Sequence, residues 1–133
     1  MPAKVLDSFA LIAYFRDEPG AETVEHLLVA AGKKDIPLHM TDVNYAEVKY
    51  SIVKKDGARA WEEAAKVLQG LPIDFHSTTR QMADTAADFK ARFSMSLADA
   101  FAAALAKEKK AELVTGDPEF KAVEKEVKVA WLK

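Results

Sequence analysis

Two patterns of hydrophobic and polar positions alternate along this chain, and together they predict strands interleaved with helices. Short apolar runs bounded by charged or turn-forming residues are typical of buried strands, whereas apolar residues three or four positions apart predict helices. The first pattern predicts strands at residues 4–6, 37–41, 72–76, 112–115 and 127–131. The second predicts helices at residues 8–15, 21–33, 42–55, 58–69, about 79–93 and 96–109, with a short helix after Pro118.

Strands that alternate with helices form a parallel sheet whose two faces the helices cover. We therefore predict the α/β class, as a three-layer α/β/α sandwich around a mostly parallel central sheet of about five short strands. The segment 96–109 is alanine-rich and apolar almost all round, which is typical of a helix buried between other elements. No internal repeat or linker interrupts the pattern, so residues 1–133 are expected to form one domain.

Composition narrows the class of protein and its compartment. Half of the residues are hydrophobic, yet no run approaches the roughly 18 apolar residues of a membrane helix, and the apolar stretch before Asp7 is too short for a signal peptide. The absence of cysteine excludes disulfides and thiolate metal sites, and a cytoplasmic protein is expected. A net charge of −2 counts mildly against a non-specific nucleic-acid binder, although a bound metal ion would add positive charge.

Four acidic residues occupy positions that this fold class would bring together. Asp7 and Asp117 follow predicted strands, and ligands in parallel sheets bind beyond the carboxyl ends of the strands. Glu47 lies in the helix after the second strand, and Asp99 lies in the first turn of a later helix. Carboxylates at close range raise one another's pKa unless a cation lies among them, and Mg²⁺ and Mn²⁺ prefer oxygen ligands. The four acids therefore predict a metal site.

Each acid also has a simpler explanation. Asp7 could cap a helix N-terminus, Asp99 could complete a capping box with Ser96, and Asp117 could cap a helix that begins with Pro118. Glu47 interrupts the apolar side of its helix and could lie at the solvated edge. These explanations are independent of one another, whereas one metal site accounts for all four acids, and we favour the metal site.

The predicted chemistry is metal-assisted hydrolysis of a phosphodiester, as in a metal-dependent nuclease. Bound Mg²⁺ or Mn²⁺ lowers the pKa of a water molecule and stabilises charge on the phosphoryl oxygens. Asp7, Asp99 and Asp117 are the predicted ligands, and Glu47 either completes the ligand set or orients the attacking water. Further oxygen-bearing side chains adjoin the acids and are suited to hydrogen bonds that hold carboxylates in place; these are Ser8, Asn44, Thr115 and Glu119.

These residues, in this order, resemble the motifs of the PIN-domain ribonucleases and, within them, of the VapC-type toxins of toxin–antitoxin pairs. The resembling segments are VLDS at residues 5–8, NYAE at 44–47, SLADA at 96–100 and LVTGDPEF at 113–120. The resemblance implies that the four acids bind metal and that the hydroxyls of Ser8 and Thr115 support them. The family often has aspartate where this chain has Glu119, whose carboxylate would reach farther out.

The resemblance also implies an activity and partners. It implies a PIN-like fold, an Mg²⁺- or Mn²⁺-dependent endoribonuclease, an RNA substrate, a homodimer and a small antitoxin protein. Two other functions stay open. The chain could be a catalytically weak PIN-like RNA-binding or scaffold module in RNA processing, although such a module has no reason to keep mutually repelling carboxylates. It could also hydrolyse a small phosphorylated molecule, although no glycine-rich phosphate loop supports that function.

Overall fold

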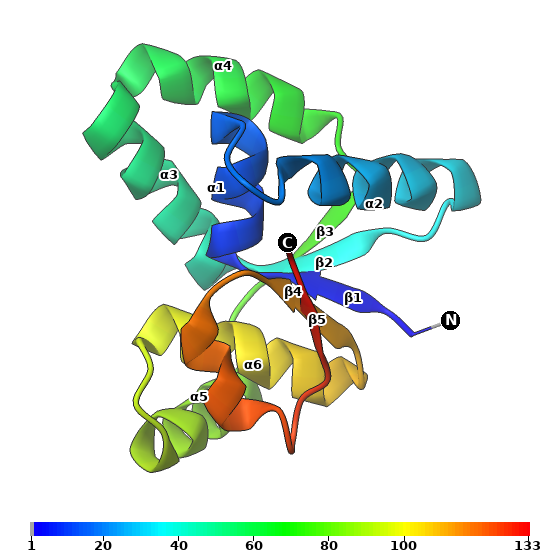
Figure 1. The fold of residues 1–133 in the computed structure, drawn as a ribbon. Helices are drawn as coiled ribbons and strands as arrows, with labels where there is room; N and C mark the ends of the chain where they lie inside the picture. Colours follow the sequence, from blue (N-terminus) through cyan, green and yellow to red (C-terminus); the bar gives the residue numbers. More distant parts are fainter. Residues whose placement is uncertain (1) are drawn as a thin grey trace.

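Five short strands form one parallel sheet, and helices cover both of its faces (Figure 1). The computed structural model describes residues 2–133. The strands are β1 (Lys4–Leu6), β2 (Leu38–Thr41), β3 (Ile73–His76), β4 (Glu112–Thr115) and β5 (Val129–Trp131). The helices are α1 (Ser8–Arg16), α2 (Ala21–Lys34), α3 (Asp42–Asp56), α4 (Ala58–Gln69), α5 (Arg80–Arg92), α6 (Leu97–Lys109) and the 3₁₀ helix η1 (Pro118–Val123). The predicted α/β sandwich is confirmed.

The order of the strands in the sheet is β3-β2-β1-β4-β5, and every neighbouring pair is parallel. The first strand of the chain is therefore the central one, with β2 on one side and β4 on the other. In the β1–β4 pair, Leu6 is in register with Val114. Because both strands run in the same direction, Asp7 and Thr115 lie side by side at the carboxyl edge of the sheet.

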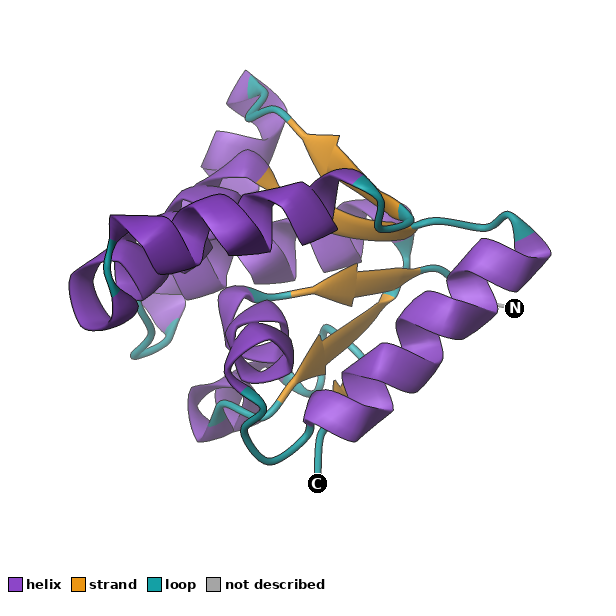
Figure 2. Cartoon of the chain, turned by 90° about the horizontal axis from the view of Figure 1, so that it is seen from above, coloured by secondary structure: helices purple, strands orange, loops and turns teal. Residues whose placement is uncertain are grey.

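The alternation of side chains along the strands divides the hydrophobic core into two layers. Figure 1 shows the helices on the two faces of the sheet, and Figure 2 shows the helices (purple) and strands (orange) from above. Val5 and Leu113 pack with α5, α6 and η1 on one face of the sheet. Leu6 and Val114 pack with helices α1 to α4 on the other face. Each central strand is thus apolar on both faces, as expected for a parallel sheet that is covered on both sides.

Helix α6 is the buried helix that its composition predicts. All eight residues from Asp99 to Ala106 are buried, and most of them are alanine, so that the helix packs closely against the sheet and α5. Asp99 is the one acid in this run. None of the described helices, α6 included, is long and apolar enough to cross a membrane.

The differences from the predicted elements lie at their ends. Thr79 and Ser96 are predicted to be helical, but they cap the helices that follow, and their hydroxyls accept the backbone N–H groups of residues 82 and 99. The segment after Asp117 is a 3₁₀ helix. The last strand begins two residues later than predicted, because the N–H of Val127 donates to the carbonyl of Val123 instead of joining the sheet.

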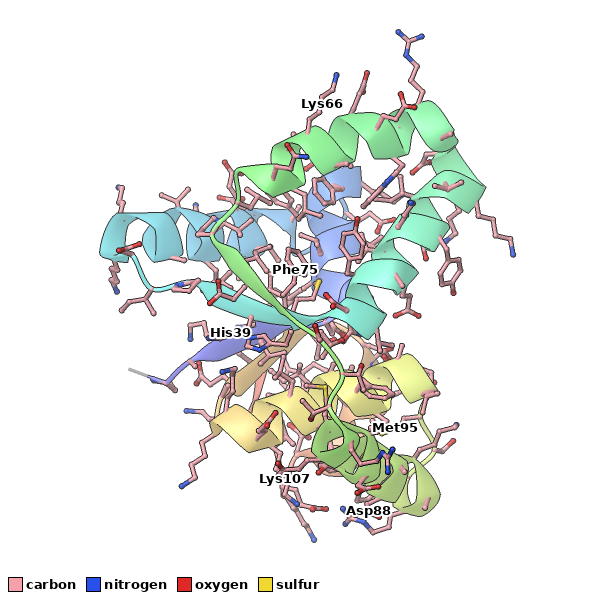
Figure 3. The ribbon with its side chains drawn as sticks, turned by 180° about the vertical axis from the view of Figure 1, so that it is seen from behind. His39, Lys66, Phe75, Asp88, Met95 and Lys107 are labelled. Carbon is pink, nitrogen blue, oxygen red and sulfur yellow. The ribbon has the colours of Figure 1, made fainter. Side chains whose placement is uncertain are left out.

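Figure 3 shows Phe75 on β3. Its ring packs edge-on against the ring of Tyr45 on α3.

Candidate metal centre

An open pocket lies where the carboxyl ends of β1 and β4 meet the first turns of α1 and α6. It is at the carboxyl edge of the sheet, where the fold class predicts a ligand site. Helix α3 closes the pocket on another side. Its walls are formed by Ser8, Phe9, Ile12, Glu47, Ser51, Ser96, Asp99, Asp117 and Glu119. Five of these nine residues belong to the set that the sequence predicts.

Three carboxylates converge in this pocket. Oxygen atoms of Asp99, Asp117 and Glu119 all lie within 4.8 Å of one another. The side chain of Asp99 is buried, that of Asp117 is half-buried and that of Glu119 is exposed. Oxygen-only donors at this spacing suit a hard divalent cation, which keeps part of its water shell. Among residues 2–133, this is the one group of three or more possible ligands that lies so close together.

Asp7 lies beneath the pocket and is only 1% exposed. Its Oδ1 accepts the N–H of Ala10 at 2.9 Å, which caps α1. Its Oδ2 accepts the hydroxyl of Thr115 at 2.5 Å. The predicted cap of α1 by Asp7 is therefore confirmed, and the role of Asp7 as a metal ligand stays a prediction.

Thr115 connects two of the acids. Its hydroxyl donates to Asp7 and accepts the backbone N–H of Asp117 at 3.0 Å. Oδ1 of Asp117 in turn accepts the N–H of Glu119 at 3.0 Å. This chain of hydrogen bonds runs from the end of β1 through the end of β4 into η1, and it fixes the backbone that carries Asp117 and Glu119.

Asn44 links three helices beneath the pocket. Its Nδ2 donates to the hydroxyl of Ser8 at 3.0 Å and to the carbonyl of Ala98 at 3.2 Å. Its Oδ1 accepts the hydroxyl of Thr41 at 2.5 Å. Asn44 is fully buried, so these bonds replace water that it would otherwise bind. They tie α1, α3 and α6 together and bring Glu47, one helical turn further along α3, to the pocket wall.

The eight predicted residues therefore gather at one edge of the sheet, and their individual roles stay predictions. Glu119, predicted as a supporting residue, lies with Asp99 and Asp117 in the group of three carboxylates. Asp7 and Glu47, predicted as ligands, lie outside that group. Asp7 is buried below it, and Glu47 is half-buried on the α3 side.

Four wall residues lie outside the predicted set: Phe9, Ile12, Ser51 and Ser96. Ser51 lies one helical turn after Glu47, so helical spacing alone could have indicated it. Phe9 and Ile12 carry no chemistry-bearing group, and in the sequence they are part of an apolar pattern that predicts a core-facing helix. Nothing in that pattern signals that Phe9 faces the acids.

Burial and mutual repulsion perturb two of the acids. Burial raises the pKa of Asp7 to about 8, with a smaller contribution from the charges of Asp99 and Asp117, and the bonds from Thr115 and Ala10 offset this only in part. Burial, followed by the charge of Asp117, raises the pKa of Asp99 to about 7. None of the salt bridges among residues 2–133 involves these acids. Buried carboxylates without a basic partner fit a bound cation, which would stabilise their charged forms.

In metal-free protein, the free energy of unfolding is expected to fall as the pH rises from about 5.5 to 8. Asp7 titrates near 3.8 when unfolded and near 8 when folded, so in this window the folded state holds the extra proton. Its contribution to stability is therefore complete below the unfolded pKa and is lost as the pH rises through the folded pKa. Each such carboxyl changes the free energy of unfolding by up to about 1.4 kcal/mol per pH unit.

Thermal melts in EDTA across this pH range measure the effect. The Asp7→Asn variant should show a shallower dependence, because an amide does not titrate. Added Mg²⁺ or Mn²⁺ should reverse the trend, since metal binds the deprotonated acids and its affinity rises with pH. The same pH dependence in EDTA for both proteins would contradict the assignment of the raised pKa to Asp7.

The model of the PIN domain family matches residues 4–126. No curated protein matches the sequence significantly.

Several solved structures share the fold over nearly the whole chain. VapBC2 from Rickettsia felis, bound to a DNA fragment from its promoter, is 12% identical, with 98% of this chain and 99% of that chain covered and a TM-score of 0.80. VapC20 from Mycobacterium tuberculosis, named as a Sarcin-Ricin loop cleaving toxin, is 17% identical, with 91% and 95% covered and a TM-score of 0.74. VapBC-1 from nontypeable Haemophilus influenzae is 19% identical, with 97% of both chains covered and a TM-score of 0.70. At sequence identities of 12% to 19%, the similarity shows that these proteins share the fold of this chain.

Proposed function

The chain belongs to the PIN domain family, and from this premise we propose that it is an endoribonuclease that depends on Mg²⁺ or Mn²⁺ and acts as the toxin of a toxin–antitoxin pair. The observation that carries the proposal is the set of carboxylates at the carboxyl edge of the sheet, two of them buried without a basic partner. The toxin assignment is supported by similarity in fold to VapBC proteins, one of which is named as a loop-cleaving toxin. We also propose that residues 1–133 act as one nuclease domain.

The acids have distinct roles in this proposal. Asp99 and Asp117, with Glu119 at the open side, would hold a divalent metal ion, and Asp7 would add charge from below. When bound, the metal supplies a water of lowered pKa and stabilises charge on the phosphoryl oxygens. Glu47 faces the same pocket from α3, and we assign it the orientation of the attacking water.

The cost of the acid cluster argues against a binding module that has lost catalysis. Burying Asp7 and Asp99 beside other carboxylates raises the pKa of both groups, so keeping them charged at neutral pH destabilises the metal-free fold. A scaffold would be more stable with amides at these positions. A metal-dependent enzyme needs the charged carboxylates to bind its metal ion, so the proposed enzyme accounts for their burial.

The function is tested by incubating purified protein with structured RNAs in Mg²⁺, Mn²⁺ or EDTA. We expect discrete fragments with either metal and intact RNA in EDTA, because chelation removes the charge that the acids require. DNA of the same sequences serves as a second substrate. Cleavage of DNA but not of RNA would show that the protein is a deoxyribonuclease and not a ribonuclease. Intact RNA after incubation with folded protein that carries no bound partner would favour the binding module.

We propose a small antitoxin protein as partner, which the similarity in fold to VapBC proteins supports. We also propose a homodimer, which the resemblance of the sequence motifs to VapC-type toxins implies, and the cytoplasm as compartment, as expected from the composition. Expression of the chain alone should arrest growth, and co-expression of a short open reading frame upstream of the gene should relieve the arrest. Native mass spectrometry of the purified protein gives the number of copies in the assembly.

Thr115→Val should lower both metal affinity and cleavage by about 10- to 100-fold, as is typical when a partner of a metal ligand is removed. Valine fills the same buried space but neither donates to Asp7 nor accepts from the N–H of Asp117. Metal affinity is measured by calorimetry with Mn²⁺, and cleavage in single-turnover assays. Thr115→Ser keeps the hydroxyl and is the matched control. A valine variant with the wild-type metal affinity would show that the hydroxyl does not position the acids.

A further inference from the structure

Phe9 lies in the first turn of α1, two residues after Asp7, and its ring forms part of the wall of the acid pocket. Its side chain is 41% exposed. A single exposed phenylalanine is common in folded proteins. Phe9 differs from that ordinary case in how its ring is held and in what surrounds it.

The ring packs directly against the backbone of Gly116, between the two residues that carry the hydrogen-bond chain of the site. A Cβ atom at residue 116 would lie 2.4 Å from Cε1 of Phe9 and 2.9 Å from its Cζ. Any side chain at this position would therefore displace the ring. Because Gly116 has no Cβ, the ring of Phe9 can contact the backbone at the end of β4. This contact holds the ring in the wall of the pocket that Asp117 also lines.

Phe9 lies at the surface and is not a buried core residue. Tyr14 and Phe15 on the same helix are half-buried and pack against the core formed with α2, α3 and α4. Ile12, one turn further along α1, is half-buried and continues the apolar wall of the pocket. An apolar surface thus adjoins the carboxylates and stays open on its outer side.

We infer that the ring of Phe9 is a platform on which an unpaired nucleobase of the substrate stacks, next to the phosphate that is cleaved. The inference rests on the proposed nuclease function and names the residue that receives a base beside the cleaved phosphate. Aromatic side chains stack on bases of any sequence, because every base has a π-face. In an RNA backbone each phosphate is flanked by two bases, so a phosphate held at the acids brings one of them within reach of Phe9.

The chemistry of the pocket favours an unpaired base over other neighbours of the phosphate. The carboxylates repel a second phosphate, while the apolar ring and Ile12 offer no hydrogen bond to a ribose. A base within a duplex is stacked on both faces and is closed to the ring, whereas bases in loops and ends can be splayed out onto an aromatic side chain. Phe9 therefore contacts a base only where the nucleotide next to the cleaved bond is unpaired.

The test compares the wild type with Phe9→Leu and Phe9→Tyr on a single-stranded substrate. Leucine keeps apolar bulk against Gly116 but removes the aromatic face, and tyrosine keeps the face. We expect Phe9→Leu to lower kcat/KM by about 5- to 150-fold, mainly through KM, and Phe9→Tyr to remain close to the wild type. The stabilisation of each protein by Mn²⁺ in thermal melts should be unchanged, because Phe9 offers the metal no ligand.

Abasic substrates locate the stacked base. The two bases that flank the cleaved bond are removed one at a time, and one of these removals should lower kcat/KM of the wild type as much as Phe9→Leu does, with no further loss in the Phe9→Leu variant. Three outcomes would overturn the stacking role but not the proposed function. They are full additivity of the base removal and Phe9→Leu, wild-type kinetics of Phe9→Leu, and a loss of stabilisation by Mn²⁺ in that variant. A wild type that cleaves no nucleic acid would overturn the proposed function and this inference with it.

Discussion

Asp99→Asn is expected to lower the rate of phosphodiester cleavage by at least about 10³-fold while leaving the fold intact. A bound metal contributes several kcal/mol to stabilisation of the transition state, and each 1.36 kcal/mol corresponds to a factor of ten in rate. The amide has nearly the shape of the carboxylate but carries no charge to balance the metal. The cap of α6 is kept, because the backbone N–H of Asp99 makes that bond to Ser96.

Single-turnover cleavage at saturating metal measures this effect, with circular dichroism and thermal melts as the check on folding. Asp84→Asn makes the same chemical change at an exposed position on α5 outside the pocket, and it should cleave at the wild-type rate. Because the substitution removes a buried charge, the metal-free Asp99→Asn protein should also melt at a higher temperature than the wild type at pH 8. Cleavage by Asp99→Asn at a rate near the wild type would remove Asp99 from the metal site.

Asn44→Ala is expected to lower the free energy of unfolding by about 2–4 kcal/mol. The substitution deletes the bonds to Ser8, Thr41 and the carbonyl of Ala98. Each lost bond costs about 1 kcal/mol, and buried groups left without a partner cost about 1–3 kcal/mol more. For a domain of this size, the melting temperature should fall by about 10 °C.

Equilibrium unfolding in urea measures the loss, with metal absent so that changes in metal binding do not contribute. Ser51→Ala is the matched control, because it removes a polar group from the same helix. Among the described residues, the Ser51 hydroxyl has no hydrogen-bond partner that the substitution would remove. Equal unfolding free energies for the two variants would mean that the Asn44 network does not hold α1, α3 and α6 together. Asn44→Ala should also impair cleavage, because Glu47 and Asp99 lie on two of the helices that Asn44 joins.

The elements were predictable where local chemistry determines them. The helix at residues 58–69 and the strand at residues 112–115 have the predicted bounds. Gly57 and Gly70 flank the helix, and Gly116 follows the strand. The ends were less predictable where a cap residue also fits the helical pattern, as Ser96 does. The start of β5 depends on a bond between Val127 and Val123 that the 3₁₀ turn creates, and the alternation of apolar residues contains no sign of it.

The place of the acids was predictable from a rule about parallel sheets, but their grouping was not. The rule puts Asp7 and Asp117 at one edge of the sheet without saying that β1 and β4 are neighbours, since strand order does not follow from local sequence. Glu119 joins the group of carboxylates because its backbone N–H binds Asp117 in the first turn of η1, and this turn directs its side chain back to Asp99. The place of Phe9 in the pocket wall depends on contact with Gly116, more than 100 positions away.

The central position of β1 has a consequence for the synthesis of the protein. Asp7 is translated before most of the domain, but the hydroxyl that holds it belongs to Thr115, 108 positions later. At about 5–20 residues per second, roughly 5–20 s pass before the ribosome reaches that residue. Throughout this time the central strand lacks one of its two neighbours, and Asp117 and Glu119 do not yet exist. A growing chain therefore carries no complete cluster until the segment that forms η1 has been made.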